Sequence, residues 1–260
     1  MEKSGYDELY KEKNKYPIGP LNIVRNNLIL REIPKKGSKA ILDIGCGRGF
    51  LDIELGKKGY HVTGVDFSEE AVNFAKKLSE QNNLSKTVNF IVGDLFKLVF
   101  DKQFDIVICS EVVEHIEDDK SAVKKLASFL NDSGILIITV PYSMRQWNKD
   151  DDRSGHFKRY YIKDMAEILQ NAGLCVGRVF VWGFPLMRIY RFLYRQTYSY
   201  SSEEENKPLG YVPKGKLMRL YHKCLPLIIK VFDIDNVFNF TRQGIDLVVV
   251  AKKSRDNLQT

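Results

Sequence analysis

The sequence contains little that would anchor the chain in a membrane, export it or cross-link it. Its 260 residues include no uninterrupted apolar run of about 18 residues, the length that a transmembrane helix needs. The N-terminal segment MEKSGYDELYKEKNKY is charged and lacks the apolar centre of a signal peptide. The cysteines lie far apart, without metal-ligand spacing, at Cys46, Cys109, Cys175 and Cys224. These absences predict a cytoplasmic protein with reduced thiols and argue against a disulfide scaffold.

Charge and apolar content limit what the chain can do. Hydrophobic residues make up 44% of the sequence, which is enough to bury a substantial core. The net charge of +7 and the pI of about 9.0 suit an anionic partner, either a nucleic acid or a membrane surface. Much of the positive charge lies in residues 183–243, which contain ten Lys and Arg against five Asp and Glu, and 11 of the 30 aromatic residues.

Short apolar runs alternate with amphipathic segments over most of the chain. We expect strands at KAILDIG (39–45), YHVTGVD (60–66), TVNFIVGD (87–94), FDIVICS (104–110), ILIITV (135–140), LCVGRVFVW (174–182) and GIDLVVVAKK (244–253). Helices are expected at 49–59, 68–83, 118–134 and 161–173, the second with Ser68 as its N-cap. This alternation predicts a parallel sheet covered on both faces. Residues 183–243 interrupt it with amphipathic helices at 183–196 and 216–232.

The segment ILDIGCGRGF, residues 41–50, places three glycines where a strand must turn into a helix. Such a turn lets backbone N–H groups face a ligand. Asp43 precedes the turn, Asp66 ends the second strand, where it could bind a ribose diol, and Asp94 ends the third. NAD is the default ligand for this layout, but the third glycine comes one position too early for it. An acidic residue before the turn would also repel a pyrophosphate, so the pattern favours a cationic nucleoside.

The ordered motifs LDIGCGRGF, VDFS, VGDL, FDIVICSEVVEHI and SGILIITVPY resemble those of the class I S-adenosylmethionine-dependent methyltransferases. Within that superfamily, SEVVEHI and GHFKRYY resemble the ubiquinone-type O-methyltransferases and related small-molecule methyltransferases. The resemblance covers about residues 38–182 and 244–252. It implies a Rossmann-like sheet of seven mostly parallel strands, the last antiparallel, with helices on both faces and a helical cap between the last two strands. It also implies S-adenosyl-L-methionine as the cofactor.

The resemblance assigns cofactor contacts by position. The methionine moiety would be lined by Asp43, Gly45, Cys46 and Gly47. Ser110 and Glu111, at the end of the fourth strand, would face the methionine end of the cofactor. The ribose hydroxyls would bind Asp66, and the adenine would lie against Phe67, Gly93, Asp94 and Leu95. For Phe67, packing in the core is an equal alternative.

The catalytic groups are expected where the fourth strand ends. Methyl transfer from a sulfonium is an in-line displacement, and a hydroxyl acceptor reacts faster when a base or metal removes its proton. Glu111, Glu114 and His115 are spaced i, i+3 and i+4, so a helical turn would group them on one face. His115 could be the base, the trio could bind a divalent ion, or His115 could merely pack against the cofactor.

The motif GHFKRYY supplies a second set of candidates after the fifth strand. His156 could be the base, and Arg159 and Tyr160 are donors that could hold an anionic group of the acceptor. The alternative is a lid that only packs over the cofactor.

The chain therefore divides by expectation into three parts. Residues 1–37 would form an N-terminal helical segment that closes over the cofactor, residues 38–182 and 244–253 the cofactor-binding core, and residues 183–243 a cap that supplies part of the acceptor pocket. The arginines and aromatics of the cap fit an aromatic or lipid-like acceptor with an anionic group. They also fit peripheral membrane contact through 184–232, or a helical hairpin whose charges are only solvated.

We expect O-methylation of a small or amphiphilic metabolite, whether aromatic, lipid-like or saccharide. The alternatives are an RNA methyltransferase, suggested by the pI, and a non-catalytic S-adenosylmethionine-binding protein. Nucleic acid is disfavoured because the fourth strand ends in Ser110-Glu111 and not in the Asn/Asp-Pro-Pro-aromatic motif of enzymes that methylate base amino groups. The chain also lacks a separate basic RNA-binding module.

Overall fold

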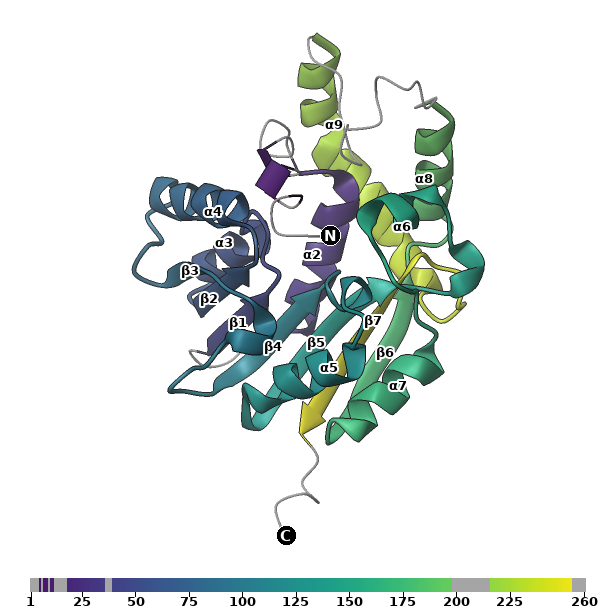
Figure 1. The fold of residues 1–260 in the computed structure, drawn as a ribbon. Coiled ribbons are helices and arrows are strands. Elements are labelled where there is room, and N and C mark those ends of the chain that lie inside the picture. The colour runs from purple at the N-terminus through teal and green to yellow at the C-terminus, as the bar shows by residue number, and fades with distance from the viewer. Residues whose placement is uncertain are drawn as a thin grey trace.

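The computed structural model describes residues 5, 7, 8, 10, 11, 18–35, 39–197 and 216–253. Its centre is a seven-stranded sheet with the order β3-β2-β1-β4-β5-β7-β6 (Figure 1). The strands are β1 (Ala40–Ile44), β2 (His61–Asp66), β3 (Val88–Val92), β4 (Phe104–Ser110), β5 (Leu130–Pro141), β6 (Leu174–Trp182) and β7 (Asp246–Lys253). Strand β7 is antiparallel to β5 and β6, and the other neighbours are parallel. The predicted Rossmann-like architecture is confirmed.

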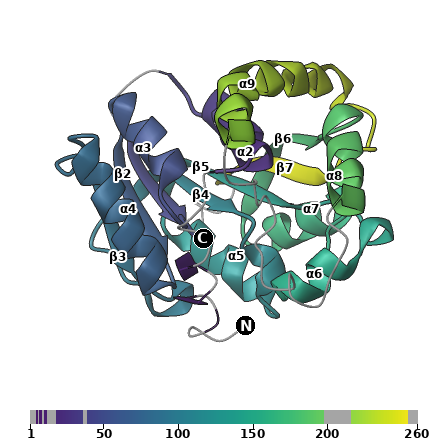
Figure 2. The same cartoon turned by 90° about the horizontal axis from the view of Figure 1, so that it is seen from above.

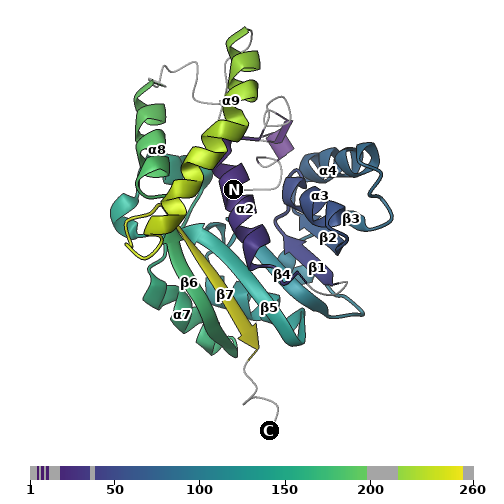
Figure 3. The ribbon, with the colours of Figure 1, turned by 180° about the vertical axis from the view of Figure 1, so that it is seen from behind.

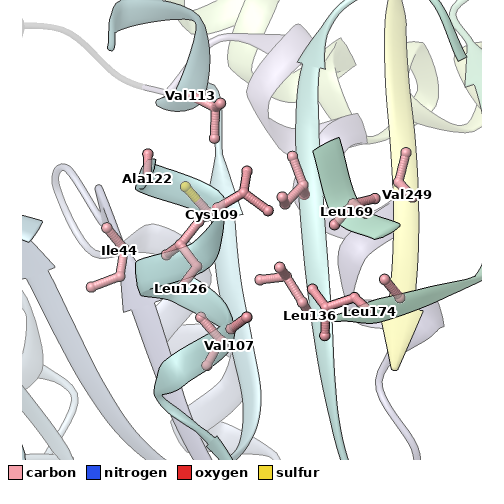
Figure 4. Packing of buried hydrophobic residues seen from close by; sticks show 14 of the residues in the cluster. Ile44, Val107, Cys109, Val113, Ala122, Leu126, Leu136, Leu169, Leu174 and Val249 are labelled. Atoms are coloured by element: carbon pink, nitrogen blue, oxygen red, sulfur yellow. The ribbon is translucent and has the colours of Figure 1, made fainter. Parts of the chain in front are cut away.

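Helices cover both faces of this sheet. Helices α5 (Asp119–Ser128) and α7 (Ile162–Asn171) lie on the near face in Figure 1, and α2 (Pro20–Glu32), α3 (Phe50–Lys57) and α4 (Glu69–Gln81) lie on the far face. Figure 4 shows the core of the near face, where Cys109 and Leu136 of the strands meet Leu126 of α5 and Leu169 of α7. Removing these apolar side chains from water is the main source of stability for such layers.

The predicted helices of the 183–243 segment are confirmed as α8 (Leu186–Thr197) and α9 (Lys216–Phe232), with the 3-10 helix η4 (Asp233–Phe238) after them. Residues 198–215 between them lie outside the described residues. A third apolar cluster joins this segment to α2 and to strands β6 and β7, through Val24, Leu28, Trp182, Met187, Ile229, Phe232 and Val248. Figure 3 shows α9 beside α2 on the rear face, and Figure 2 shows α8 and α9 over the β6–β7 side.

Two elements differ from the sequence expectation. The helix expected at 118–134 ends at Ser128, because Leu130 is fully buried and pairs with Phe104 as the start of β5. The polar run NKDDDRSG, to which the sequence pattern assigned no helix, forms the short helix α6 (Lys149–Ser154). Asn148 caps that helix, and its backbone N–H donates to Asp151 in a capping box.

The carboxyl ends of the parallel strands meet at one edge of the sheet. Strands β1, β2, β4 and β5 end there, and β7 begins there, because Asp246 pairs with both Pro141 and Trp182. Figure 1 shows α8 and the upper part of α9 rising beyond this edge. The 3-10 helices η1 (Leu95–Lys97), η2 (Val113–His115) and η3 (Met144–Gln146) follow strands that end there. Among the helices that the structure describes, none has both the length and the apolar character that crossing a bilayer requires.

Candidate active site

The glycine turn between β1 and α3 is held tightly against neighbouring elements. Gly45 has a φ of 78°, and a Cβ there would lie 2.1 Å from a methyl of Val112. Gly47 has a φ of 53°, and a Cβ there would lie 2.9 Å from the hydroxyl of Tyr10. Both positions need glycine, because a side chain would clash and L-residues rarely adopt such φ values. The N–H groups of Gly45 and Cys46 both donate to the carbonyl of Val65, which fixes the turn to β2.

Asp66 connects this turn to the start of α4. Its Oδ2 accepts a 2.8 Å hydrogen bond from the backbone N–H of Gly47, and its Oδ1 accepts one of 2.9 Å from Ser68. Ser68 caps α4, as predicted, by accepting from the N–H of Ala71. A carboxylate oxygen has two lone pairs, so each oxygen of Asp66 keeps the capacity to accept from a ribose hydroxyl.

Asp43 and Asp52 form a buried pair of carboxyl groups beneath the turn. Within the described part of the chain, Asp43 Oδ1 and both carboxyl oxygens of Asp52 have no hydrogen-bond donor. Burial raises the pKa of Asp43 well above its usual value, and each carboxyl group faces the other. Burial likewise raises the pKa of Asp52 to about 7. Two carboxyls without donors are stable together when one proton is shared between them, so the pair does not carry two negative charges near neutral pH.

The residues predicted to bound the adenine lie after β2 and β3. Phe67 is 38% exposed, whereas Leu95 is buried in the core. Asp94 is half-buried, and its Oδ1 accepts from the N–H of Phe96, so that it caps η1. Gly93 donates its N–H to the carbonyl of Asp66, which keeps the two strand ends together.

At the end of β4, Glu111 has a backbone φ of 58°, which is unusual for a residue with a side chain. Its Oε1 accepts a 3.0 Å hydrogen bond from the Thr139 hydroxyl, and its Oε2 lies 2.9 Å from Nη2 of Arg25. The same hydroxyl of Thr139 lies 2.8 Å from that of Ser110. Burial raises the pKa of Glu111 although the nearby Arg25 guanidinium opposes this change.

A cluster of possible metal ligands lies next to Glu111 but differs from the predicted trio. One ligand atom from each of Glu114, His115 and His156 lies within 4.8 Å of the others, and Glu111 instead faces Thr139 and Arg25. Glu114 is fully buried, and among the described residues no donor reaches either of its carboxyl oxygens. Burial, reinforced by the charge of Glu111, raises the pKa of Glu114 well above its usual range. Such a group is stabilised by a proton or by a cation.

The loop after β5 carries a hydrogen-bonded chain that ends at His156. Its Nδ1 lies 2.8 Å from Asp151 Oδ1, which also accepts a 2.8 Å hydrogen bond from Arg159 Nε. The rings of His156 and His115 meet edge to face with centroids 4.7 Å apart. Two residues predicted to hold the acceptor are buried: Arg159 binds Asp151, and the hydroxyl of Tyr160 donates to Asp119. In this structure both of them support the loop, and neither faces open space.

Sequence reasoning missed several residues that shape this site. They are Tyr10, Arg25, Asp52, Thr139, Asp151 and Asp246. Asp151 had a signal, because it follows the N-cap Asn148 by three positions, the spacing of a capping box. Arg25 had none, because its partners lie in strands far along the chain.

Comparisons with known proteins agree with this geometry. The family model described as "Methyltransferase domain" matches residues 35–175, more than half of the chain. The ubiquinone biosynthesis O-methyltransferase of Coxiella burnetii is 39% identical over 124 residues, which are 47% of this chain and 52% of that protein. The chain thus spans about half the length of the curated relatives that it matches.

Two solved structures share the fold at low identity. Magnesium protoporphyrin IX methyltransferase from Synechocystis PCC 6803, with bound SAH, has a TM-score of 0.52 and 19% identity, and the match covers 90% of this chain and 82% of that one. The 4+2 cyclase SpnF has a TM-score of 0.60 and 17% identity, with 88% and 80% covered. The chain belongs to the methyltransferase-domain family, and its core is a class I S-adenosylmethionine-dependent methyltransferase domain.

Proposed function

We propose that the protein transfers a methyl group from S-adenosylmethionine to a hydroxyl of a small or amphiphilic acceptor. The observation that carries this proposal is the His156–Asp151 pair, which adjoins the buried Glu114 at the carboxyl edge of the sheet. The name of the Coxiella relative, a ubiquinone biosynthesis O-methyltransferase, supports an oxygen acceptor. The fold alone would not, since a 4+2 cyclase shares it.

The residues around the glycine turn fit the cofactor. When bound, S-adenosylmethionine supplies an electrophilic methyl group on a positively charged sulfur. We assign the ribose hydroxyls to Asp66 and the methionine end to Gly45, Gly47 and the Asp43–Asp52 pair. The negative charge that this pair takes on as Asp52 ionises near pH 7 suits a cationic ligand and would disfavour a pyrophosphate. The donor-free oxygens of Asp43 and Asp52 are the feature that fits a ligand with N–H groups or ordered water.

In the reaction, His156 acts as the general base. Asp151 accepts the Nδ1 hydrogen of His156, so the lone pair remains on Nε2. With the cofactor bound, Nε2 of His156 would accept the proton of the acceptor hydroxyl as that oxygen takes the methyl group, and the electrons of the methyl–sulfur bond would stay on sulfur. His115, whose ring contacts that of His156, is the alternative base.

A divalent cation is a second way to activate the same hydroxyl. Glu114, His115 and His156 offer one carboxylate and two imidazoles, a donor set that suits zinc and other transition-metal ions. A cation there would acidify a hydroxyl bound to it. Calorimetric titration with Zn²⁺ and Mn²⁺ tests this, with Glu114→Gln as the variant and Glu117→Gln as the matched control. Equal metal affinity in both variants would show that Glu114 does not bind a metal ion, and would exclude metal activation at this cluster.

The lipid-like class of acceptor is favoured by the exposed apolar side chains of α8, α9 and η4, among them Phe192, Leu227 and Val237. The RNA alternative is weakened by Cys109, which is fully buried and whose thiol has a pKa raised well above its usual value by burial. A thiol of this kind does not attack a pyrimidine.

The direct test supplies methyl-labelled S-adenosylmethionine with three acceptors: dodecylcatechol, catechol and total RNA. We expect label in the catechols, with the alkylated one preferred. We also expect His156→Gln to lower kcat at least about 100-fold while S-adenosylhomocysteine binds as before, the scale of general-base catalysis. Label in RNA alone would overturn the proposal, and so would tight cofactor binding without transfer to either catechol. Loss of activity in His115→Gln but not in His156→Gln would identify His115 as the base.

A further inference from the structure

Arg25 is a buried arginine of helix α2 that reaches the carboxyl edge of the sheet. Its Nη2 lies 2.9 Å from Glu111 Oε2 at the end of β4 and 2.9 Å from Asp246 Oδ2 at the start of β7. Its guanidinium carbon lies 6.0 Å from the ring centroid of Trp182 at the end of β6. One side chain of the N-terminal helix therefore contacts the ends of three strands.

The charges around Arg25 are unbalanced without it. Glu111 and Asp246 are both within ion-pair distance, and the buried Glu114 is close enough to feel their charges. Leaving a buried carboxylate without its cation is far more costly than removing both partners of a pair. A planar guanidinium suits this position, because it serves two carboxylates at once and keeps its charge when buried.

The packing of α2 onto the sheet does not require the charge of Arg25. The helix already packs through Val24 and Leu28 against the apolar cluster, and Ile29 enters the neighbouring cluster on the same face. Replacing a buried ion pair by apolar side chains of similar size is often neutral or stabilising. The polar contacts of Arg25 go to Asn22 on its own helix and to Glu111 and Asp246 at the edge of the sheet. Glu111 has a left-handed backbone, and its side chain contacts Arg25 and Thr139.

We propose that Arg25 is a positioning residue of the methyl-transfer site, holding the Glu111 carboxylate at the end of β4 through the shared Glu111–Arg25–Asp246 contact. Its catalytic consequence rests on the proposed function. Helix α2 thereby becomes part of the site, since a movement of α2 would displace the Glu111 carboxylate from the end of β4.

The kinetic test compares Arg25→Met and Arg25→Lys with Arg31→Met. Arg31 is a matched control, because it lies on the same helix and pairs with Asp233 at the surface. With dodecylcatechol as acceptor, we expect Arg25→Met to lower kcat at least tenfold while the calorimetric affinity for S-adenosylhomocysteine changes less than threefold. Arg25→Lys should recover part of kcat, and Arg31→Met should match the unmodified protein. Equal loss of kcat and cofactor affinity, with no recovery in Arg25→Lys, would reduce Arg25 to a structural role and overturn the proposal.

A second measurement tests the contact between Arg25 and Glu111, on which the proposal depends, independently of the acceptor. Urea denaturation of Arg25→Met, Glu111→Gln and the double variant gives the coupling between the two side chains. We expect the double variant to be clearly more stable than the sum of the single changes predicts, because each single change strands a buried charge. Additive effects would overturn the proposal even if no tested acceptor is methylated. Should Arg25→Met fail to fold, Arg25→Lys replaces it in the same cycle.

Discussion

The Nδ1 atom of His156 lies 2.8 Å from Oδ1 of Asp151, in a carboxylate that is almost completely buried. Burial by itself would raise the pKa of Asp151, but the hydrogen bonds from His156 and Arg159 outweigh it and lower that pKa to about 2. Asp151 is therefore ionised near neutral pH. An ionised carboxylate favours the imidazole tautomer with its hydrogen on Nδ1, which leaves Nε2 of His156 as the basic atom.

Asp151→Asn should lower kcat by about 10- to 100-fold, the scale known for losing the carboxylate that orients a metal-binding histidine. The amide cannot balance the charge of Arg159, and it no longer favours one tautomer of His156. Binding of S-adenosylhomocysteine, measured by calorimetry, should not change. Asp152→Asn is the matched control, since Asp152 is the next residue and accepts from Trp147 near the surface. Equal turnover in both variants would exclude His156 as the base.

Asp52→Asn should make folding stability less dependent on pH. The folded-state pKa of Asp52 is raised to about 7, so the folded protein holds this proton more tightly than the unfolded chain does. Stability from this group is present below about pH 4 and is lost as the pH rises toward 7. Between pH 5 and pH 8, the free energy of unfolding of the unmodified protein, measured by urea denaturation, should fall by about 2 kcal/mol relative to that of Asp52→Asn. Glu54→Gln on the same helix is the control. If the difference in free energy of unfolding between the unmodified protein and Asp52→Asn stays constant from pH 5 to pH 8, Asp43 and Asp52 do not share a proton.

Asp66→Ala should weaken binding of S-adenosylmethionine by about 1–3 kcal/mol, the cost of leaving buried hydrogen-bonding groups without partners. The variant would lose the ribose contact and also the acceptor of the Gly47 N–H, so both effects act in the same direction. Calorimetric titration measures the change. Glu69→Ala, an exposed change in the first turn of α4, should leave the affinity as it was. An unchanged affinity in Asp66→Ala would contradict the ribose assignment.

The strands and the glycine turn were predictable because local chemistry determines them. Near-continuous apolar runs, such as the one ending at Ser110, have few alternatives to a buried parallel strand, and positive φ values at Gly45 and Gly47 follow from the strand-to-helix turn. Ser68 is a good helix cap in any context, and it caps α4 here. In each case the determining residues are neighbours in sequence.

The charge pairs of the site were not predictable in the same way. Arg25 and Asp246 are 221 residues apart, and no local pattern marks either as the partner of Glu111. Arg159 illustrates a second limit, because its residue type suggested a donor to an anionic group of the acceptor, while the loop turns it inward onto Asp151. Sequence gives the kind of side chain, and the packing of distant elements decides where it points.

The exposed stripe on α9 and η4 should bind an anionic membrane surface. Leu227, Val231 and Ile234 follow one another at spacings of four and three residues and are each more than 40% exposed. Exposed Lys223 and Lys230 lie on the same helix. An apolar stripe flanked by lysines fits a bilayer that contains phosphatidylserine, because the lysines attract the headgroups while the apolar side chains enter the interface.

We expect the protein to co-sediment with vesicles of phosphatidylcholine and phosphatidylserine. The Leu227→Asp/Ile234→Asp double variant should bind at least about tenfold more weakly, because each change removes apolar area and adds a carboxylate that the anionic headgroups repel. Val99→Asp is the control: Val99 is 84% exposed and lies between β3 and β4, away from α9. Raising the salt concentration should weaken binding, because it screens the lysines. Equal binding of the double variant and the control would show that another surface contacts the bilayer. If the unmodified protein does not bind the vesicles even at low salt, the stripe on α9 and η4 is not a membrane-binding surface.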